Sequence, residues 1–100
     1  MINQINREEA LKLIAENKKN SQFVIIDVRT TKEFEQQHLP QAVNFNIYDQ
    51  HFREQILKLN RQKIYLIYCK SGGRSSLAAE IMEELGFLHL YNLNDMTFQE

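Results

Sequence analysis

Apolar runs and amphipathic segments alternate along the chain, and this pattern predicts its elements. Four apolar runs predict strands at residues 23–26, 42–45, 63–68 and 88–91. Continuously apolar runs, as in the first and third of these, are typical of parallel strands buried on both faces. Four segments predict helices at residues 7–17, 32–37, 49–59 and 75–85. This alternation predicts an α/β fold, with a central parallel sheet of about five strands flanked by helices on both faces.

Residues suited to helix ends stand beside the predicted helices. Asn6 followed by Glu9 is typical of a capping box at the start of the first helix. A threonine at position 30 or 31 is expected to cap the second helix, and Asp49 the third. Gly86 is expected to end the fourth helix, because glycine readily takes the left-handed conformation common there.

Length and composition limit the classes of protein to consider. One hundred residues fit a single domain over residues 1–100, and 43% hydrophobic with 25% charged residues is typical of a soluble globule. The net charge is -1 and the cationic residues are scattered, so neither nucleic acid nor a membrane surface is an expected partner. No segment has the apolar length of a signal peptide or a membrane span, so a cytoplasmic protein is expected.

The chain has one cysteine, Cys69. A single thiol excludes an internal disulfide and is too few for a structural zinc site. The three histidines, His38, His51 and His89, are too dispersed to indicate a metal site. Cys69 is therefore a buried small hydrophobe, a redox group or a nucleophile.

The residues around Cys69 favour the nucleophile. The thiol lies between a predicted strand and a predicted helix, where backbone N–H groups and the positive end of the helix dipole lower a thiol pKa. The expected anion-binding loop comprises Lys70, Ser71, Gly72, Gly73, Arg74 and Ser75. Its glycines allow inward-facing amides, and its two cations add positive charge. Two reactions fit this loop: formation of a persulfide on Cys69, or attack on a phosphate ester.

Several segments, including this loop, resemble the single-domain rhodaneses. The loop at 69–75 reads Cys-Lys-Ser-Gly-Gly-Arg-Ser and resembles the family's Cys-x-x-Gly-x-Arg-Ser. Further similar segments, in the family's order and spacing, are Asp27-Val28-Arg29, Glu33-Phe34, residues 38–42, residues 86–87 and residues 91–93. The resemblance covers nearly the whole chain.

The resemblance implies a rhodanese-like fold and sulfurtransferase activity. Cys69 would take a sulfane sulfur from a small anionic donor such as thiosulfate, or from a protein persulfide. It would then pass that sulfur to cyanide or a thiol, with the amides of residues 70–75 stabilising the persulfide. The resemblance implies no metal and no organic cofactor.

Asp27, Arg29 and Glu33 are expected to support the loop without taking part in the chemistry. Arg29 is expected to pair with Glu33, one turn into the next helix. Asp27 is expected to accept hydrogen bonds from loop amides or from Arg74.

Two other functions fit parts of the pattern. Phosphatases of a related fold place five residues between cysteine and arginine, whereas four separate Cys69 from Arg74, which favours sulfur over phosphate. A non-catalytic rhodanese-like binding module is the second alternative, because residues 94–100 depart from the family's closing Gly-Gly and tryptophan. Glutamines also replace the usual glycines at positions 37 and 41. The closing segment predicts an altered or shortened pocket wall, and the glutamines predict different turns around residues 38–40.

Overall fold

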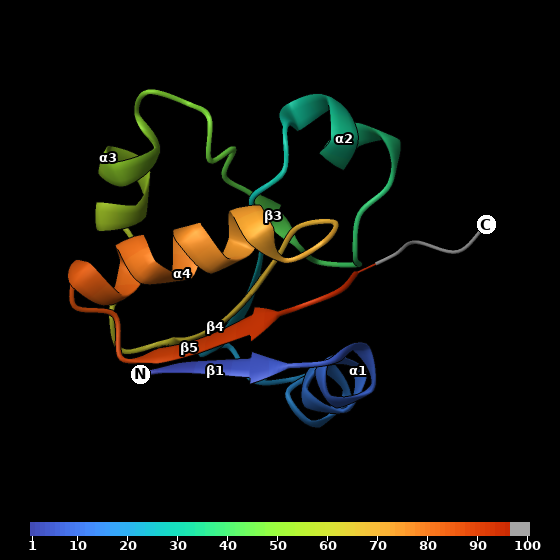
Figure 1. Cartoon of the computed structure of the whole chain (residues 1–100). Coiled ribbons are helices and arrows are strands. Elements are labelled where there is room, and N and C mark those ends of the chain that lie inside the picture. Colours follow the sequence, from blue (N-terminus) through green and yellow to red (C-terminus); the bar gives the residue numbers. More distant parts are fainter. Residues whose placement is uncertain (97–100) are drawn as a thin grey trace.

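The computed structural model describes residues 1–96, and the last four residues of the segment 94–100 lie outside the described part. Its strands are β1 (Ile2–Ile5), β2 (Phe23–Asp27), β3 (Val43–Asn44), β4 (Ile64–Tyr68) and β5 (His89–Leu93). They form one parallel sheet in the order β1-β5-β4-β2-β3, so β4 is central (Figure 1).

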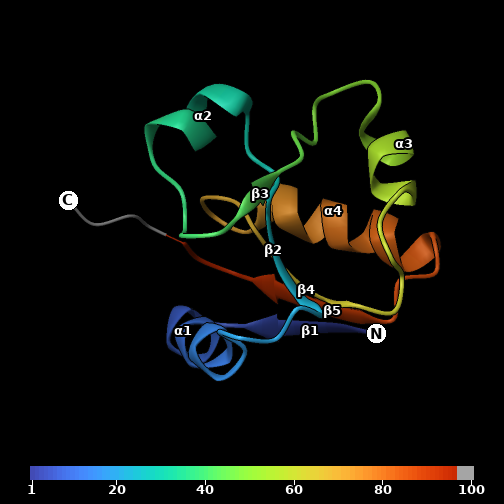
Figure 2. The same cartoon turned by 180° about the vertical axis from the view of Figure 1, so that it is seen from behind.

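Helices cover both faces of this sheet, as predicted. They are α1 (Arg7–Glu16), α2 (Thr31–Gln36), α3 (Phe52–Leu57) and α4 (Gly73–Glu84). Helix α1 lies on one face and α3 and α4 on the other, whereas α2 lies near the carboxyl ends of the strands (Figures 1 and 2). The predicted α/β architecture is confirmed.

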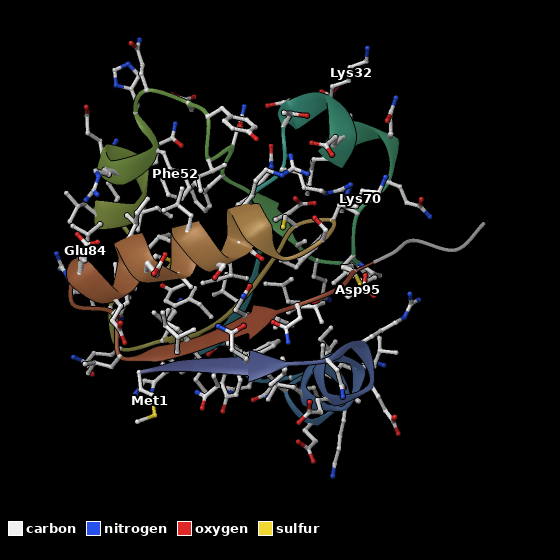
Figure 3. All side chains as sticks on the ribbon, in the orientation of Figure 1. Met1, Lys32, Phe52, Lys70, Glu84 and Asp95 are labelled. Atoms are coloured by element: carbon white, nitrogen blue, oxygen red, sulfur yellow. The ribbon has the colours of Figure 1, made fainter. Side chains whose placement is uncertain are left out.

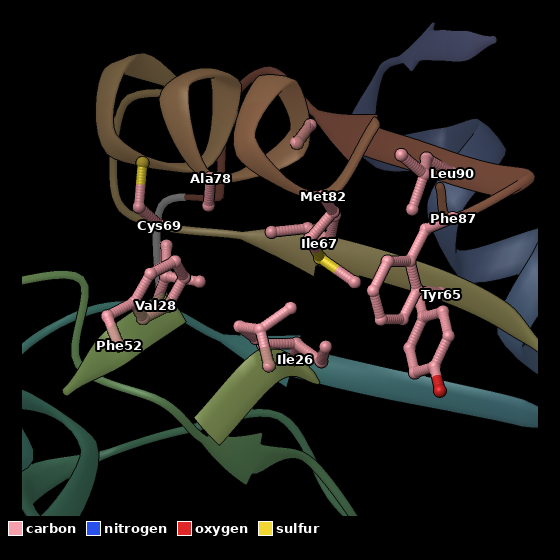
Figure 4. Close-up of a cluster of buried hydrophobic side chains, with 12 residues drawn as sticks. Ile26, Val28, Phe52, Tyr65, Ile67, Cys69, Ala78, Met82, Phe87 and Leu90 are labelled. Carbon is pink, nitrogen blue, oxygen red and sulfur yellow. The ribbon is translucent and has the colours of Figure 1, made fainter. Parts of the chain in front are cut away.

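A buried apolar cluster lies on each face of the sheet. On the α4 face, Ile67 and Cys69 pack with Met82 and Phe87 (Figure 4). On the α1 face, Leu66 and Tyr68 pack in a second cluster with α1. Because successive side chains of a strand point to opposite faces, β4 contributes to both clusters, and Cys69 belongs to the α4 face.

Local signals account for most helix ends. The Asn6–Glu9 capping box is present, with the Asn6 side chain accepting from the Glu9 N–H at 2.8 Å. Thr30 caps α2 in the same way. The prediction for Asp49 is wrong: α3 begins at Phe52, and the Asp49 carboxylate accepts from the His51 N–H in the turn before the helix.

Helix α4 begins two residues earlier than the predicted start at position 75 and ends as expected. Gly86 has φ +93°, and the N–H groups of Gly86 and Phe87 donate to the carbonyls of Glu83 and Met82. This is the Schellman arrangement, which uses glycine to satisfy the last helical carbonyls.

Strand β1 was not among the predicted strands. Its two central residues, Asn3 and Gln4, are polar and exposed because β1 is an edge strand paired with β5. Strand β3 is shorter than the predicted 42–45. It comprises two residues, which pair with the end of β2. Edge strands carry little of the apolar pattern on which the prediction depends.

Candidate functional site

Cys69 lies at the carboxyl end of the central strand β4, a few residues before the N-terminus of α4. Its side chain is directed towards the first turns of α4 (Figure 4). The backbone N–H of Gly72 donates to Sγ at 3.1 Å, and the N–H of Ser75 donates at 3.4 Å. The residue is fully buried, so these donors meet the sulfur with little competition from water.

Ser75 adds a hydroxyl to the same cradle. Its Oγ lies 3.4 Å from Cys69 Sγ, which donates to it as a neutral thiol. The hydroxyl donates to the carbonyl of Gly72 at 3.2 Å. When the sulfur is ionised, the hydroxyl proton can rotate towards it, because a hydroxyl both donates and accepts.

The balance of these effects lowers the Cys69 pKa below its usual value. Burial is the largest influence and raises the pKa, because it disfavours the charged thiolate. Hydrogen bonds from the Ser75 side chain and from the N–H groups of Ser75, Gly72 and Arg74 together lower it by more. Cys69 is thus a buried thiol whose surroundings favour the thiolate.

Gly72 is required by the geometry of the loop. It has φ +93°, and a Cβ there would lie 2.4 Å from the carbonyl oxygen of Asn94. A Cβ on Gly73, by contrast, would meet nothing within 4 Å. The loop therefore passes close to the chain that follows β5. This close approach requires glycine at position 72 but not at position 73.

The segment after β5 forms a wall against the loop within the described residues. The Met96 N–H donates to the Lys70 carbonyl at 3.0 Å, and the Asn94 N–H donates to the Ile5 carbonyl at 3.0 Å. Met96 is also buried in the cluster on the α1 face. Residues 94–96 depart from the family pattern but still form a wall against the loop. The rest of segment 94–100 lies outside the described residues.

The two cations of the loop differ in their surroundings. Arg74 donates to both carboxylate oxygens of Glu33, at 2.7 and 3.1 Å, so its charge is compensated. Lys70 is exposed and forms no salt bridge within residues 1–96. Lys70 and Asp95 lie at the same end of the molecule, away from Glu84 (Figure 3). Ser71 is exposed beside Lys70.

The predicted pairing of Arg29 with Glu33 is not the one formed. Arg29 instead binds both carboxylate oxygens of Asp27, with its NH2 nitrogen 2.8 Å from Oδ2, and the pair is buried. Asp27 also accepts from the Arg29 N–H at 2.9 Å, which agrees with the expected loop amide. Glu33 is left for Arg74, so Asp27 does not bind Arg74.

The Asp27–Arg29 pair supports the loop after α2. Arg29 donates to the Gln37 carbonyl, and its guanidinium lies 5.8 Å from the centre of the Tyr68 ring. The Tyr68 hydroxyl accepts from the Leu39 N–H at 3.0 Å. Tyr68 faces the α1 side and Cys69 the α4 side. Of the three expected support residues, Glu33 binds a side chain of the Cys69 loop, that of Arg74.

Two residues of this network carried no clear sequence signal. Asn44 donates from Nδ2 to the carbonyls of Asp27 and Arg29, at 2.9 and 3.0 Å. The hydroxyl of Tyr68 anchors Leu39, although an aromatic residue in an apolar run predicts only packing. Both contacts join segments far apart in the sequence, which a local pattern does not show.

Comparison with protein families decides what kind of protein carries this loop. The model of the rhodanese-like domain matches residues 6–95. The chain belongs to the rhodanese-like family. The thiosulfate sulfurtransferase GlpE of Coxiella burnetii is 31% identical over 93% of this chain and 81% of its own length. A tRNA sulfurtransferase of Pyrobaculum aerophilum is 40% identical over 63% of this chain, which spans only 13% of that enzyme.

Solved structures of the rhodanese-like family share this fold. The rhodanese-like domain protein of Staphylococcus aureus has a TM-score of 0.76, with 26% identity over 93% of this chain and 85% of that one. Within residues 1–96, no helix is long and apolar enough to cross a bilayer. The same residues contain no group of three or more histidine, cysteine or acidic side chains placed to hold a metal.

Proposed function

We propose that this rhodanese-like protein is a sulfurtransferase that carries a sulfane sulfur on Cys69. The observation that carries the proposal is the set of polar groups around one sulfur: the N–H groups of Gly72 and Ser75, which donate to it, and the Ser75 hydroxyl 3.4 Å away. Its relative GlpE is named a thiosulfate sulfurtransferase, which supports the same reaction here.

The first half-reaction loads the sulfur. The Cys69 thiolate attacks the sulfane sulfur of a donor such as thiosulfate, forming a new S–S bond. The bond between the donor's two sulfurs breaks, and sulfite leaves with the electron pair. The negative charge moves to the outer sulfur of the persulfide. The N–H groups of Gly72 and Ser75 donate to Sγ before the reaction begins, and in this proposal the amides of the loop also stabilise the charge on the outer sulfur.

The second half-reaction removes the sulfur. A thiophile such as cyanide, or the thiolate of a small thiol, attacks the outer sulfur. The persulfide bond breaks, and its electron pair returns to Cys69 as thiolate. The loop that favours the thiolate in the resting enzyme also makes Cys69 a good leaving group, since a lower pKa speeds departure.

The cations of the loop take different roles in this proposal. Lys70 is the exposed cation of the loop, so it attracts the anionic donor. Arg74 contributes its backbone N–H to the Cys69 environment, and its guanidinium fixes the loop to α2 through Glu33. We further propose a cytoplasmic setting, because a reducing compartment suits a chain with one free thiol. A protein persulfide remains an alternative donor.

Intact mass spectrometry tests the proposal directly. The chain is exposed to thiosulfate, desalted and weighed before and after treatment with a reductant. We expect a gain of one sulfur atom that the reductant removes and that the Cys69→Ser variant does not show. Thiocyanate release on adding cyanide to the loaded protein then completes the cycle.

Two controls separate the alternatives. Release of phosphate from a generic aryl phosphate, with no sulfur gain from thiosulfate, would instead identify a phosphatase. A folded chain that gains no sulfur from thiosulfate, from a small persulfide or from a persulfidated protein would identify a non-catalytic module. Circular dichroism of the Cys69→Ser variant verifies that the comparison is made between folded proteins.

A further inference from the structure

A cavity of about 400 Å³ opens beside β2, on the face of the sheet that carries α1. Its walls come from the carboxyl half of α1, from β2 and from the loop that leads into β3. None of the residues 69–75 contributes to it, so it is separate from the Cys69 site. We call this cavity the β2 groove, defined by Ile14, Lys18, Phe23, Ile25, Pro40 and Val43.

The lining of the β2 groove is mainly apolar. Phe23 and Ile25 form its floor, since both side chains pack in the cluster on the α1 face. Pro40 and Val43 form one wall, and Val43 remains 41% exposed. A volume of this size, lined mostly by apolar groups, is within the range of ligand sites.

The groove also runs along an unpaired part of a strand. The first residue of β3, Val43, lies opposite Ile26, so the earlier residues of β2 have only β4 as a strand neighbour within residues 1–96. The Asp27 carbonyl accepts from Phe45 on the β3 side, so by alternation Phe23 and Ile25 direct their backbone groups to that same edge. The Phe23 N–H is bound by the Asn20 carbonyl.

Two backbone groups remain at this edge of β2, and they are placed to bind one residue of an added strand. The Phe23 carbonyl and the Ile25 N–H flank Val24, whose backbone faces β4. In a parallel ladder, such a pair binds the N–H and the carbonyl of one residue on the next strand. A small apolar ligand would use the floor of the groove and leave this pair unused, whereas an extended peptide uses both.

The positive charge at the groove favours peptides that carry an acidic side chain. Among residues 1–96, Lys18 is the one ionisable side chain that lines it, and Lys19 follows outside the lining. Neither lysine forms a salt bridge within residues 1–96. A carboxylate placed near Lys18 therefore meets an uncompensated positive charge.

A strained residue stands at the rim. Gln41 has φ +67°, and it is the one non-glycine residue with positive φ in the described chain. The left-handed conformation is unfavourable for a residue that carries a side chain. Strain of this kind is concentrated at ligand sites, where the surrounding structure holds it in place.

We propose that the β2 groove binds an extended peptide segment of a partner protein, added as a short strand along β2. Apolar side chains of that segment pack on Phe23 and Ile25, and an acidic side chain lies near Lys18. The site is independent of sulfur transfer at Cys69, so either proposal can fail without the other.

Backbone NMR of the full chain tests the site. The probe is a pool of acetylated hexapeptides in which valine, isoleucine, leucine or phenylalanine alternates with threonine or glutamate. We expect changes in backbone amide chemical shift at residues 14–18, 23–25 and 40–43. We also expect slower hydrogen exchange of the Ile25 N–H. Shifts confined to residues 69–75, or no shift at millimolar peptide, would overturn the proposal.

Paired variants test the predicted contacts. Lys18→Glu should weaken binding of the glutamate peptides about two- to fivefold, which is the range for one exposed charge pair. Lys19→Glu is the matched control and should change the affinity for the glutamate peptides little. Val43→Arg, at an exposed position, should block binding while leaving the fold intact.

A second probe separates a peptide site from a simple apolar one. Decanoate carries an apolar chain and a carboxylate but no peptide groups. If decanoate reproduces all the shifts and the peptides give no protection of the Ile25 N–H, the groove is a site for small amphipathic acids and the strand-addition proposal is wrong.

Discussion

Arg74 and Glu33 form a two-point contact that joins the Cys69 loop to α2. The guanidinium lies 2.7 and 3.1 Å from the two carboxylate oxygens, and both side chains are half-buried. Glu33 also caps its own helix by accepting from the Thr30 N–H at 3.1 Å. One carboxylate therefore fixes the start of α2 and the start of α4 together.

The Glu33→Gln substitution tests this contact. Hydrogen bonds from Arg74, with smaller contributions from Thr30, outweigh the effect of burial and lower the Glu33 pKa from 4.5 to about 2. The contact is thus fully present above pH 4.5 and lost as the pH falls towards 2. We expect the variant to lose about 1–2 kcal/mol of stability at neutral pH and less at acid pH. Urea unfolding at several pH values measures this, with the exposed Glu35→Gln as control. An equal loss at every pH would show that the charge of Glu33 is not responsible.

The glycine pair offers a matched test of loop geometry. Gly72→Ala should destabilise the chain by more than about 1–2 kcal/mol, because it adds both left-handed strain and a clash with Asn94. It should also raise the Cys69 pKa by moving the Gly72 N–H away from the sulfur. Gly73→Ala should be tolerated, since its Cβ would meet open space. Thermal unfolding of both variants checks the prediction, and equal effects would contradict it.

The ionisation of Cys69 can be followed by the ultraviolet absorbance of its thiolate. We expect a midpoint below the ordinary thiol value of about 8.5. Ser75→Ala should raise that midpoint, because it removes the hydroxyl next to Sγ. Ser76→Ala, the neighbouring serine without that contact, should leave it unchanged. An ordinary midpoint in the unsubstituted chain would show that the loop does not activate the thiol.

The buried Asp27–Arg29 pair predicts a large effect on stability. Asp27→Asn leaves the guanidinium of Arg29 buried without its counter-charge and should cost about 3–5 kcal/mol. Glu54→Gln removes the partner of His51 in an exposed pair and should cost less than about 1 kcal/mol. Chemical unfolding of the two variants gives the comparison. Similar small losses would mean that water reaches the Asp27 site.

The sequence pattern predicts the elements with strong local signals. The apolar runs of β2 and β4 and the capping box of α1 each depend on neighbours in the sequence, and each is found. The position of the Cys69 loop between β4 and α4 is also found, because it follows from the order strand, glycines and helix, although residues 73–75 belong to α4.

Other features depend on the fold as a whole. Strand β1 has two polar central residues and becomes a strand only because β5 lies beside it. The sequence predicts Arg29 with Glu33, and Asp27 with loop amides or Arg74. In the fold Arg29 binds Asp27 and Arg74 binds Glu33, because these partners lie nearest in space. The β2 groove likewise requires α1 and the loop before β3 to meet across β2.

The position of β5 has a consequence for synthesis on the ribosome. Strand β1 is made first but pairs only with β5 within residues 1–96, and β5 lies between β1 and β4. The first strand must therefore wait for β5 to emerge. Asn94 and Met96, which close over the loop, emerge later still. A nascent chain can assemble β2, β3 and β4 early, but its thiol acquires a finished surrounding only when residue 96 has left the exit tunnel.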